Sequence, residues 1–256
     1  MKRTYYSILA TAILAVMVAA CGGGGSGSGG SSSGGKKSAK ITMTTEEGGN
    51  FSFTLYGSGV ATVDWGDGSE KVSLTLSEHR VAFRHTYPNA TIRTISINGD
   101  NITGLQCYDI TNLDVSRCTE LEILSCHGQF KSLDVSRNTA LTSLTVGDQL
   151  TSLDVSKNTA LILLDVFCSQ LTSLDVSKNT ALIELRVSSQ LTSLDVSRNT
   201  ALKRLDVSGQ LTSSALNALF RTLHSNAGEK YINIYNNPGA NDCDRSIAES
   251  KGWTFR

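Results

Sequence analysis

The hydrophobic positions between residues 102 and 213 recur in two alternating units. The longer unit has eleven residues, as in LTSLDVSKNTA (150–160), and the shorter one usually has nine, as in LTSLTVGDQ (141–149). In each LxxLxV segment the fourth and sixth residues of an extended chain point the same way. The full pattern returns only after both units, so one coil takes about twenty residues and stacks on the next one.

This pattern places two rows of apolar residues inside the coils. On the wall built from LDVS segments the inward residues are Leu133, Val135, Leu153, Val155, Leu174, Val176, Leu194 and Val196. On the wall built from the shorter units they are Leu124, Cys126, Leu144, Val146, Leu164, Val166, Leu185, Val187, Leu205 and Val207. Neither row alone makes a core, so we expect strands on both walls to stack coil upon coil.

An asparagine follows the LDV segment at the same place in four coils. These residues are Asn138, Asn158, Asn179 and Asn199. An inward amide at this place can bond the backbone of successive turns, which would otherwise be buried unpaired. Cys118 takes the position in the first coil and can satisfy fewer groups, which predicts a looser end.

The nested units resemble the bacterial leucine-rich repeats with alternating 10- and 11-residue units, known as the IRREKO type. The resemblance covers about 110 residues and implies a solenoid. Here the shorter units end in VGDQ, VSSQ or VSGQ and lack the Asn that the family places before Gln. A full second asparagine ladder is therefore not expected.

Residues 39–101 alternate with a period of two between Gly, Asn and Asp clusters, which is typical of an antiparallel β-sandwich. Separate strands are predicted at 41–43, 51–55, 60–65, 72–76, 81–83 and 91–97. The strings VDWGDGS (63–69) and FRHTY (83–87) resemble the signature of polycystic-kidney-disease-type (PKD) domains, which implies an immunoglobulin-like accessory module. We interpret Asp67 as shaping a turn and His85 as packing locally rather than forming a site with Asp64. The domain is expected to cover the first coil.

Residues 214–256 predict a cap for the last coil. Leu216, Leu219, Phe220 and Leu223 have helical spacing after Ser213 or Ser214, and a strand (231–235), a second helix (244–251) and a last strand (253–255) follow. The strings NNPG and SIAESKGW resemble the C-terminal cap of the same bacterial repeat lipoproteins. The expected fold is thus mainly β: an immunoglobulin-like (PKD-like) β-sandwich (39–101), a leucine-rich-repeat solenoid (102–213) and a small α/β C-terminal cap (214–256).

Residues 1–21 have the features of a targeting segment. Lys2 and Arg3 precede an apolar run that is too short for a comfortable membrane span. The run ends in VAAC (18–21), which resembles the lipobox of bacterial lipoproteins and implies cleavage before Cys21 and lipidation there. Residues 22–38, nearly all Gly and Ser, predict a flexible tether. The expected location is the bacterial outer membrane, anchored by lipid and facing the cell surface, and a periplasmic orientation stays open.

Composition and motifs argue against several classes of function. The formal net charge is +0 and no basic cluster occurs, which speaks against nucleic acid as a partner. The four histidines are scattered, and no GxSxG, HExxH, P-loop or CxxC string appears. We therefore expect no catalytic residues, no metal and no cofactor. Five cysteines follow Cys21, and Cys107 and Cys126 fit as buried thiols, while Cys243 near His224 is interpreted as a cap thiol rather than a nucleophile.

The two walls differ in what they present outward. The LDVS wall repeats Asp114, Asp134, Asp154, Asp175 and Asp195 beside Arg117, Arg137, Lys157, Lys178 and Arg198. We interpret it as a solvated structural face, with a calcium-binding or glycan-binding ladder as the alternative. The other wall varies from coil to coil, and its candidate ligand-binding residues are Glu122, Ser125, His127, Thr145, Asp148, Asp165, Phe167, Glu184, Arg186, Arg204 and Asp206. Phe167 is the aromatic residue among them, and aromatic residues favour interfaces.

These features favour a non-catalytic surface protein that binds or adheres to a protein or glycan through the variable wall. One alternative is a structural envelope spacer without a specific ligand. Another is an accessory polysaccharide-binding lipoprotein of a nutrient-capture system.

We predict that Leu174→Asp abolishes cooperative thermal unfolding, because the substitution buries an unpaired charge at a cost of several kcal/mol. Circular dichroism during heating measures this effect. An unchanged melting curve would show that the inward register is wrong.

Overall fold

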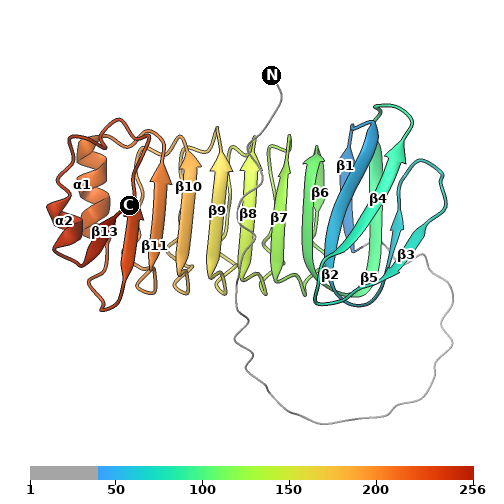
Figure 1. The fold of residues 1–256 in the computed structure, drawn as a ribbon, viewed down its shortest axis with the longest axis horizontal. Helices are drawn as coiled ribbons and strands as arrows, with labels where there is room; N and C mark the ends of the chain where they lie inside the picture. The colour runs from blue at the N-terminus through green and yellow to red at the C-terminus, as the bar shows by residue number, and fades with distance from the viewer. Residues whose placement is uncertain (1–39) are drawn as a thin grey trace, which may run out of the picture. The chain divides into compact units, whose positions relative to one another are not determined.

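A parallel β-sheet of stacked coils is the central element of the structure, a computed structural model that describes residues 40–256 apart from the side chain of Asp148. Its repeat strands are β7 (Ile123–Gly128), β8 (Ser143–Asp148), β9 (Leu163–Cys168), β10 (Glu184–Ser189) and β11 (Arg204–Ser208), which lie side by side in chain order (Figure 1). Leucines at the same place in successive units, such as Leu124, Leu144 and Leu164, are direct register partners. The solenoid with a coil of about twenty residues is therefore confirmed.

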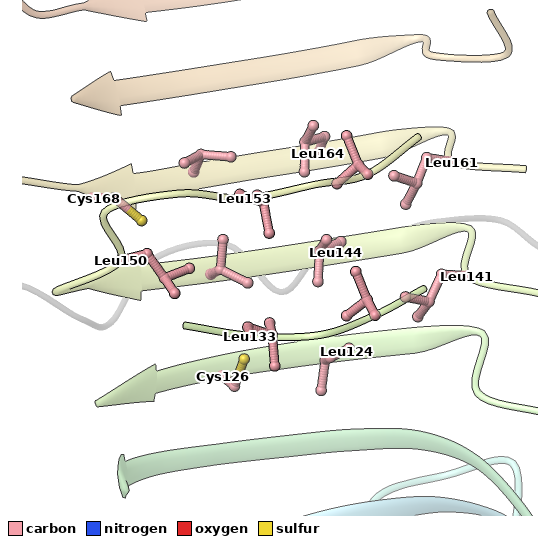
Figure 2. Packing of buried hydrophobic residues seen from close by; sticks show 14 of the residues in the cluster. Leu124, Cys126, Leu133, Leu141, Leu144, Leu150, Leu153, Leu161, Leu164 and Cys168 are labelled. Atoms are coloured by element: carbon pink, nitrogen blue, oxygen red, sulfur yellow. The ribbon is translucent and has the colours of Figure 1, made fainter. Parts of the chain in front are cut away.

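The predicted inward residues of both walls form the core of the coils. Leu133 and Leu153 of the LDVS wall lie opposite the strand leucines, and residues of each kind stack from coil to coil (Figure 2). All the predicted inward leucines, valines and Cys126 are buried. Full burial of one leucine contributes roughly 1.5–3 kcal/mol, so stability rises with each added coil.

The prediction of strands on the LDVS wall is wrong for most coils. Among the residues that the structure describes, only Asn112–Asp114 (β6) is a strand on this wall. In every coil, that of β6 included, the Asp of LDVS ends the extended segment, because its Oδ1 accepts a hydrogen bond from the backbone N–H two residues later. Asp154 does so from Ser156 at 2.8 Å. β6 is a strand because it pairs with β1, whereas the LDVS segments of the later coils have no such partner strand among the described residues.

The four predicted asparagines form a buried ladder between coils. Asn158 Nδ2 donates to the carbonyls of Val135 and Asn138 in the preceding coil, at 2.9 Å each. Asn138, Asn179 and Asn199 repeat this arrangement, and all four side chains are fully buried. Each carbonyl of the turn also accepts a backbone N–H from within that turn, as Val135 does from Asn138 at 3.0 Å. The amides therefore supply the bonds that join one turn to the next.

Cys118 starts the ladder with a single bond. Its Sγ donates to the carbonyl of Ile102 at 3.3 Å, where an asparagine would reach two carbonyls. Cys107 and Cys126 are fully buried register partners, as predicted, and burial raises the pKa of the Cys107 thiol to about 12.

The N-terminal strands are fewer than predicted, and all of them except β3 are longer. They are β1 (Ile41–Thr45), β2 (Gly49–Asp64), β3 (Val72–Thr75), β4 (Val81–Tyr87) and β5 (Arg93–Ile110). The predicted strands 51–55 and 60–65 are halves of β2, which bends where its register with β5 shifts. Gly57 makes this bend possible, since its φ is +147° and a Cβ there would lie 1.9 Å from the carbonyl oxygen of Asn101.

The long strand β5 joins these N-terminal strands to the repeats. Its first half pairs with β1, its second half pairs with β7 in parallel, and β2 pairs along both halves. β1 also pairs with β6, so the first coil is covered on both walls, as expected. β5 passes residue 101 without a break, and residues 40–256 belong to one compact unit. The domain boundary at 101 and the immunoglobulin-like sandwich stay predictions.

The expected local roles of Asp67 and His85 are present. Asp67 Oδ1 accepts from the backbone N–H of Ser69 at 3.0 Å, and Oδ2 lies 2.7 Å from Nε2 of His85. The His85 ring stacks on Trp65 at 4.9 Å and meets the edge of Tyr87. Hydrogen bonds from Ser69 and His85 hold the pKa of Asp67 well below its usual value.

The cap continues the parallel sheet and closes its core with a helix. Helix α1 (Ser213–Thr222) begins after Thr212, whose hydroxyl accepts from the backbone N–H of Ala215, and it buries the predicted apolar residues. Strands β12 (Lys230–Asn233) and β13 (Trp253–Phe255) extend the sheet beyond β11. Helix α2 (Ser246–Glu249) is shorter than the predicted 244–251.

The cap also supplies an asparagine that the sequence interpretation missed. Asn237 Nδ2 donates to the carbonyls of Val207 and Ile234, at 2.8 and 2.9 Å, and its Oδ1 accepts from the backbone N–H of Leu211. INIYNNPG (232–239) follows the pattern of LDVSKNTA, so Asn237 corresponds to a ladder asparagine. Asn237 follows a strand of the sheet, whereas the shorter repeat units have no asparagine after their strands.

We predict that Asn158→Ala lowers the free energy of unfolding by about 2–3 kcal/mol, because it removes two buried bonds between coils and leaves a small cavity. Urea denaturation at a constant m-value measures the loss. The matched control is Lys157→Ala at the exposed neighbouring position, for which a change within about 0.5 kcal/mol is expected. Equal losses in the two variants would contradict the ladder's role.

Candidate functional site

The side chains of β7–β11 that point away from the core form what we call the outer sheet face. The register places Ser125, Thr145, Asp165, Arg186 and Asp206 in one row across the five strands. The repeats hold the backbone of each strand in the same place while these side chains differ. The variable wall of the sequence is thus the strand wall, on which rigid elements present dissimilar side chains.

Five of the predicted residues come together on this face as a charged group, the Arg186 network. Its members are Asp165, Glu184, Arg186, Arg204 and Asp206. Arg186 contacts Asp165 at 3.2 Å, Glu184, and Asp206 at 3.8 Å. Arg204 lies 3.3 Å from Glu184 and 2.7 Å from Asp206. Three carboxylates face two guanidinium groups, so the fully ionised network carries one negative charge in excess.

Asp165 is the unusual member of the network, because it was expected to be exposed and is buried. The Arg186 side chain from the next coil pairs with it. Burial raises the pKa of Asp165 to about 6, against the opposing effect of Arg186. Its Oδ1 has no hydrogen-bond partner among the residues that the structure describes. The carboxylate therefore stays incompletely satisfied beneath the outer sheet face.

An exposed apolar group lies next to the charged one. Phe167 is 38% exposed, and its register partners Gly147 and Ser188 are small. Ile162 and Ile183, each 39% exposed, sit in consecutive coils joined by a bond from Ile183 N–H to the Ile162 carbonyl. Aromatic residues and arginines are enriched at protein interfaces.

The remaining predicted residues do not join the network. Glu122 precedes β7, and its carbonyl accepts backbone N–H groups of the next coil. Thr145 lies on β8, and His127 lies on β7 with its ring stacked on Tyr108. The side chain of Asp148 and the whole of residues 1–39, which include Cys21, lie outside the described residues.

Sequence reasoning missed the outward residues of β5, notably Gln106 and Tyr108. Tyr108 is 39% exposed, and its hydroxyl accepts a hydrogen bond from Gln106. The signal was present in the string LQCYD (105–109), where inward Leu105 and Cys107 alternate with these two residues.

The LDVS wall uses its carboxylates for structure. Each Asp of the row accepts the backbone N–H of its turn. Hydrogen bonds from Ser116 keep the pKa of Asp114 below its usual value, and those from Ser156 do the same for Asp154. Among residues 40–256, no three His, Cys, Asp or Glu side chains group closely enough to hold a metal ion.

The cap residues His224 and Cys243 have separate partners. His224 Nε2 lies 2.7 Å from the carbonyl of Leu202, and Cys243 Sγ donates to the carbonyl of Ala240. These bonds give both side chains a local structural role.

Comparisons with known proteins give a partial likeness. No family model matches the sequence, and no curated protein matches it. Among solved structures, the chain is similar to the functional domain of InlJ from Listeria monocytogenes, which includes a cysteine ladder. The identity is 30%, the match covers 57% of this chain and 32% of that chain, and the TM-score is 0.47. No ligand or binding face is carried over from a likeness of this extent.

One further observation concerns the membrane. No helix among residues 40–256 is both long and apolar enough to cross a bilayer.

We predict that Asp165→Asn becomes more stabilising, relative to the unsubstituted protein, as the pH rises from 4 to 7. The pKa of Asp165 is raised in the folded state, so its contribution to stability is complete below about pH 4 and is lost as the pH passes 6. Between these pH values, the free energy of unfolding of the variant should rise relative to that of the unsubstituted protein by on the order of 3 kcal/mol. Urea denaturation at several pH values measures it.

Asp154→Asn is the matched control on the other wall. Hydrogen bonds lower the pKa of Asp154, so this carboxylate stabilises the fold at neutral pH and stops doing so on acidification. Relative to the unsubstituted protein, Asp154→Asn should therefore become less stable as the pH rises, which is the opposite of the trend for Asp165→Asn. A parallel trend in the two variants would contradict the assignment.

Proposed function

We propose that this protein is a lipid-anchored, non-catalytic protein of the bacterial cell surface that binds a protein or glycan through its outer sheet face. The observation that carries the proposal is the outer sheet face itself. Its strands repeat the same backbone position, but the outward side chains differ from coil to coil and include the Arg186 network and Phe167. Inward side chains form the core, and the LDVS carboxylates accept hydrogen bonds within the turns. The outward positions of the strand wall are the ones at which the side chains differ between coils.

Rigidity supports this role. Asp165, Glu184 and Asp206 hold the two arginines in place before any partner arrives, so little side-chain freedom remains to be lost on binding. The exposed Phe167 ring beside them supplies apolar area. An anchor residue next to oriented charges suits selective recognition.

The anchoring part of the proposal rests on the sequence. Cys21 follows Val18-Ala19-Ala20 as in a lipobox, and the Gly/Ser stretch after it supplies a tether. A diacylglyceryl group on the thiol and one acyl group on the new amino terminus would give three acyl chains, more than the two signals needed for stable membrane attachment. The outer membrane is the proposed location, with residues 39–101 as a PKD-like module between tether and repeats. Protease treatment of intact cells tests exposure, and full protection of the repeats would place them in the periplasm.

We predict that Phe167→Ala/Arg186→Ala weakens binding about tenfold or more, because the double substitution removes the apolar anchor and the centre of the charged network. The measurement is an array of glycans and host proteins probed with the mature protein, followed by titration of each hit. Phe167→Ala alone, which leaves the network intact, is expected to show part of the loss.

The matched control is Lys178→Ala/Arg198→Ala on the LDVS wall, which should bind like the unsubstituted protein. Melting curves establish that every variant is folded. If only this control lost binding, the binding site would lie on the LDVS wall and the proposal would be wrong. Absence of any bound partner would favour a structural spacer.

A further inference from the structure

A second group of oriented polar and aromatic side chains lies where the N-terminal strands meet the repeats, outside the Arg186 network. This group, the junction cluster, consists of Tyr56, Arg80, Gln106, Tyr108 and His127. Arg80 Nε donates to the Tyr56 hydroxyl at 2.9 Å, and its Nη2 donates to Gln106 Oε1 at 2.8 Å. Gln106 Nε2 donates to the Tyr108 hydroxyl at 2.6 Å. One hydrogen-bonded chain thus connects β2, the segment before β4, and β5.

Two glycines make room for aromatic rings of this cluster. A Cβ on Gly104, the register partner of Tyr56, would be 2.7 Å from Cδ2 of that ring. A Cβ on Gly147 would be 2.3 Å from Nδ1 of His127. The His127 ring stacks on Tyr108, with centroids 5.4 Å apart and planes 6° apart. Small residues beneath the rings fix their positions without a larger core.

The directions of the hydrogen bonds leave donors available for a ligand. Both tyrosine hydroxyls accept bonds within the chain, so each O–H remains to donate outward. Arg80 is exposed and uses two of its five N–H donors in these bonds. A partner rich in hydroxyl acceptors satisfies this arrangement.

The aromatic surface is suited to the C–H face of a sugar ring. His127 covers one face of Tyr108, and on the other side of β5 the next residue of β2 beyond the last register pair is Ser52, which is small and exposed. The second face of the Tyr108 ring is therefore accessible. An aromatic face carries partial negative charge and attracts polarised C–H groups.

A protein partner fits this patch less well than a sugar. A standard protein interface covers about 800 Å² per partner around an apolar centre. Tyr108 and Ile123 are the exposed large apolar residues of β5 and β7, while Arg80 and Gln106 are polar. Planar hydrogen-bonding groups beside a single aromatic face match a saccharide.

We infer that the junction cluster is a carbohydrate-binding subsite, in which a pyranose ring stacks on Tyr108 and its hydroxyls bond to Arg80 and Tyr56. This inference deepens the proposed function, on which it rests, and assigns a glycan to a position centred on Tyr108 rather than on Phe167 and Arg186.

The test is affinity electrophoresis of the mature protein in gels that contain a soluble β-glucan, a soluble α-glucan or a mannan. At least one gel should retard the protein, and Tyr108→Ala and Arg80→Ala should each weaken that interaction about tenfold. Tyr235→Ala, at an aromatic position of the cap that is 60% exposed, is the matched control and should migrate like the unsubstituted protein. Melting curves establish that the variants are folded.

Several outcomes would overturn the subsite. One is the absence of retardation in all three gels, and another is equal retardation of Tyr108→Ala and the unsubstituted protein. Retardation that is lost in Phe167→Ala/Arg186→Ala but kept in Tyr108→Ala would support the outer sheet face and reject the junction cluster. A protein ligand bound without any polysaccharide would do the same.

Discussion

The bond from each ladder asparagine to the preceding turn is the interaction on which the rest of the structure depends. A coil of about twenty residues buries only two short apolar rows, so it gains a core only by stacking on its neighbours. Asn158 and its equivalents tie each turn to the one before it through two carbonyls. The coils are then held in the alignment that the strand register requires, and the sheet follows from the ladder and the core together.

This constraint divides the outward positions into fixed and free ones. On the LDVS wall the Asp side chain must close an Asx turn so that the following asparagine reaches its buried place. The wall therefore repeats. On the strand wall the backbone is satisfied by neighbouring strands, and the outward side chains close no turn of the ladder. Side chains of different size and charge therefore fit on this wall.

The spacing of leucines and asparagines was enough to predict the coil length, both inward rows and the ladder. It could not tell which wall is the sheet, because both units share the LxxLxV pattern. The burial of Asp165 depends on Arg186, which comes from the next coil and is 21 residues away. The bend of β2 at Gly57 depends on the close approach of Asn101. Such features arise from contacts between segments, which periodicity does not encode.

The same stacking gives the Arg186 network its properties. A carboxylate on an isolated strand would be hydrated, whereas Asp165 lies under the arginine of the adjoining coil and loses most of its water. The cost of burying it is offset by a guanidinium group that two further carboxylates hold in place. Binding of a ligand over this face would remove more water and strengthen each of these charge interactions. The ladder thus fixes the spacing at which charges from separate coils meet on the outer sheet face.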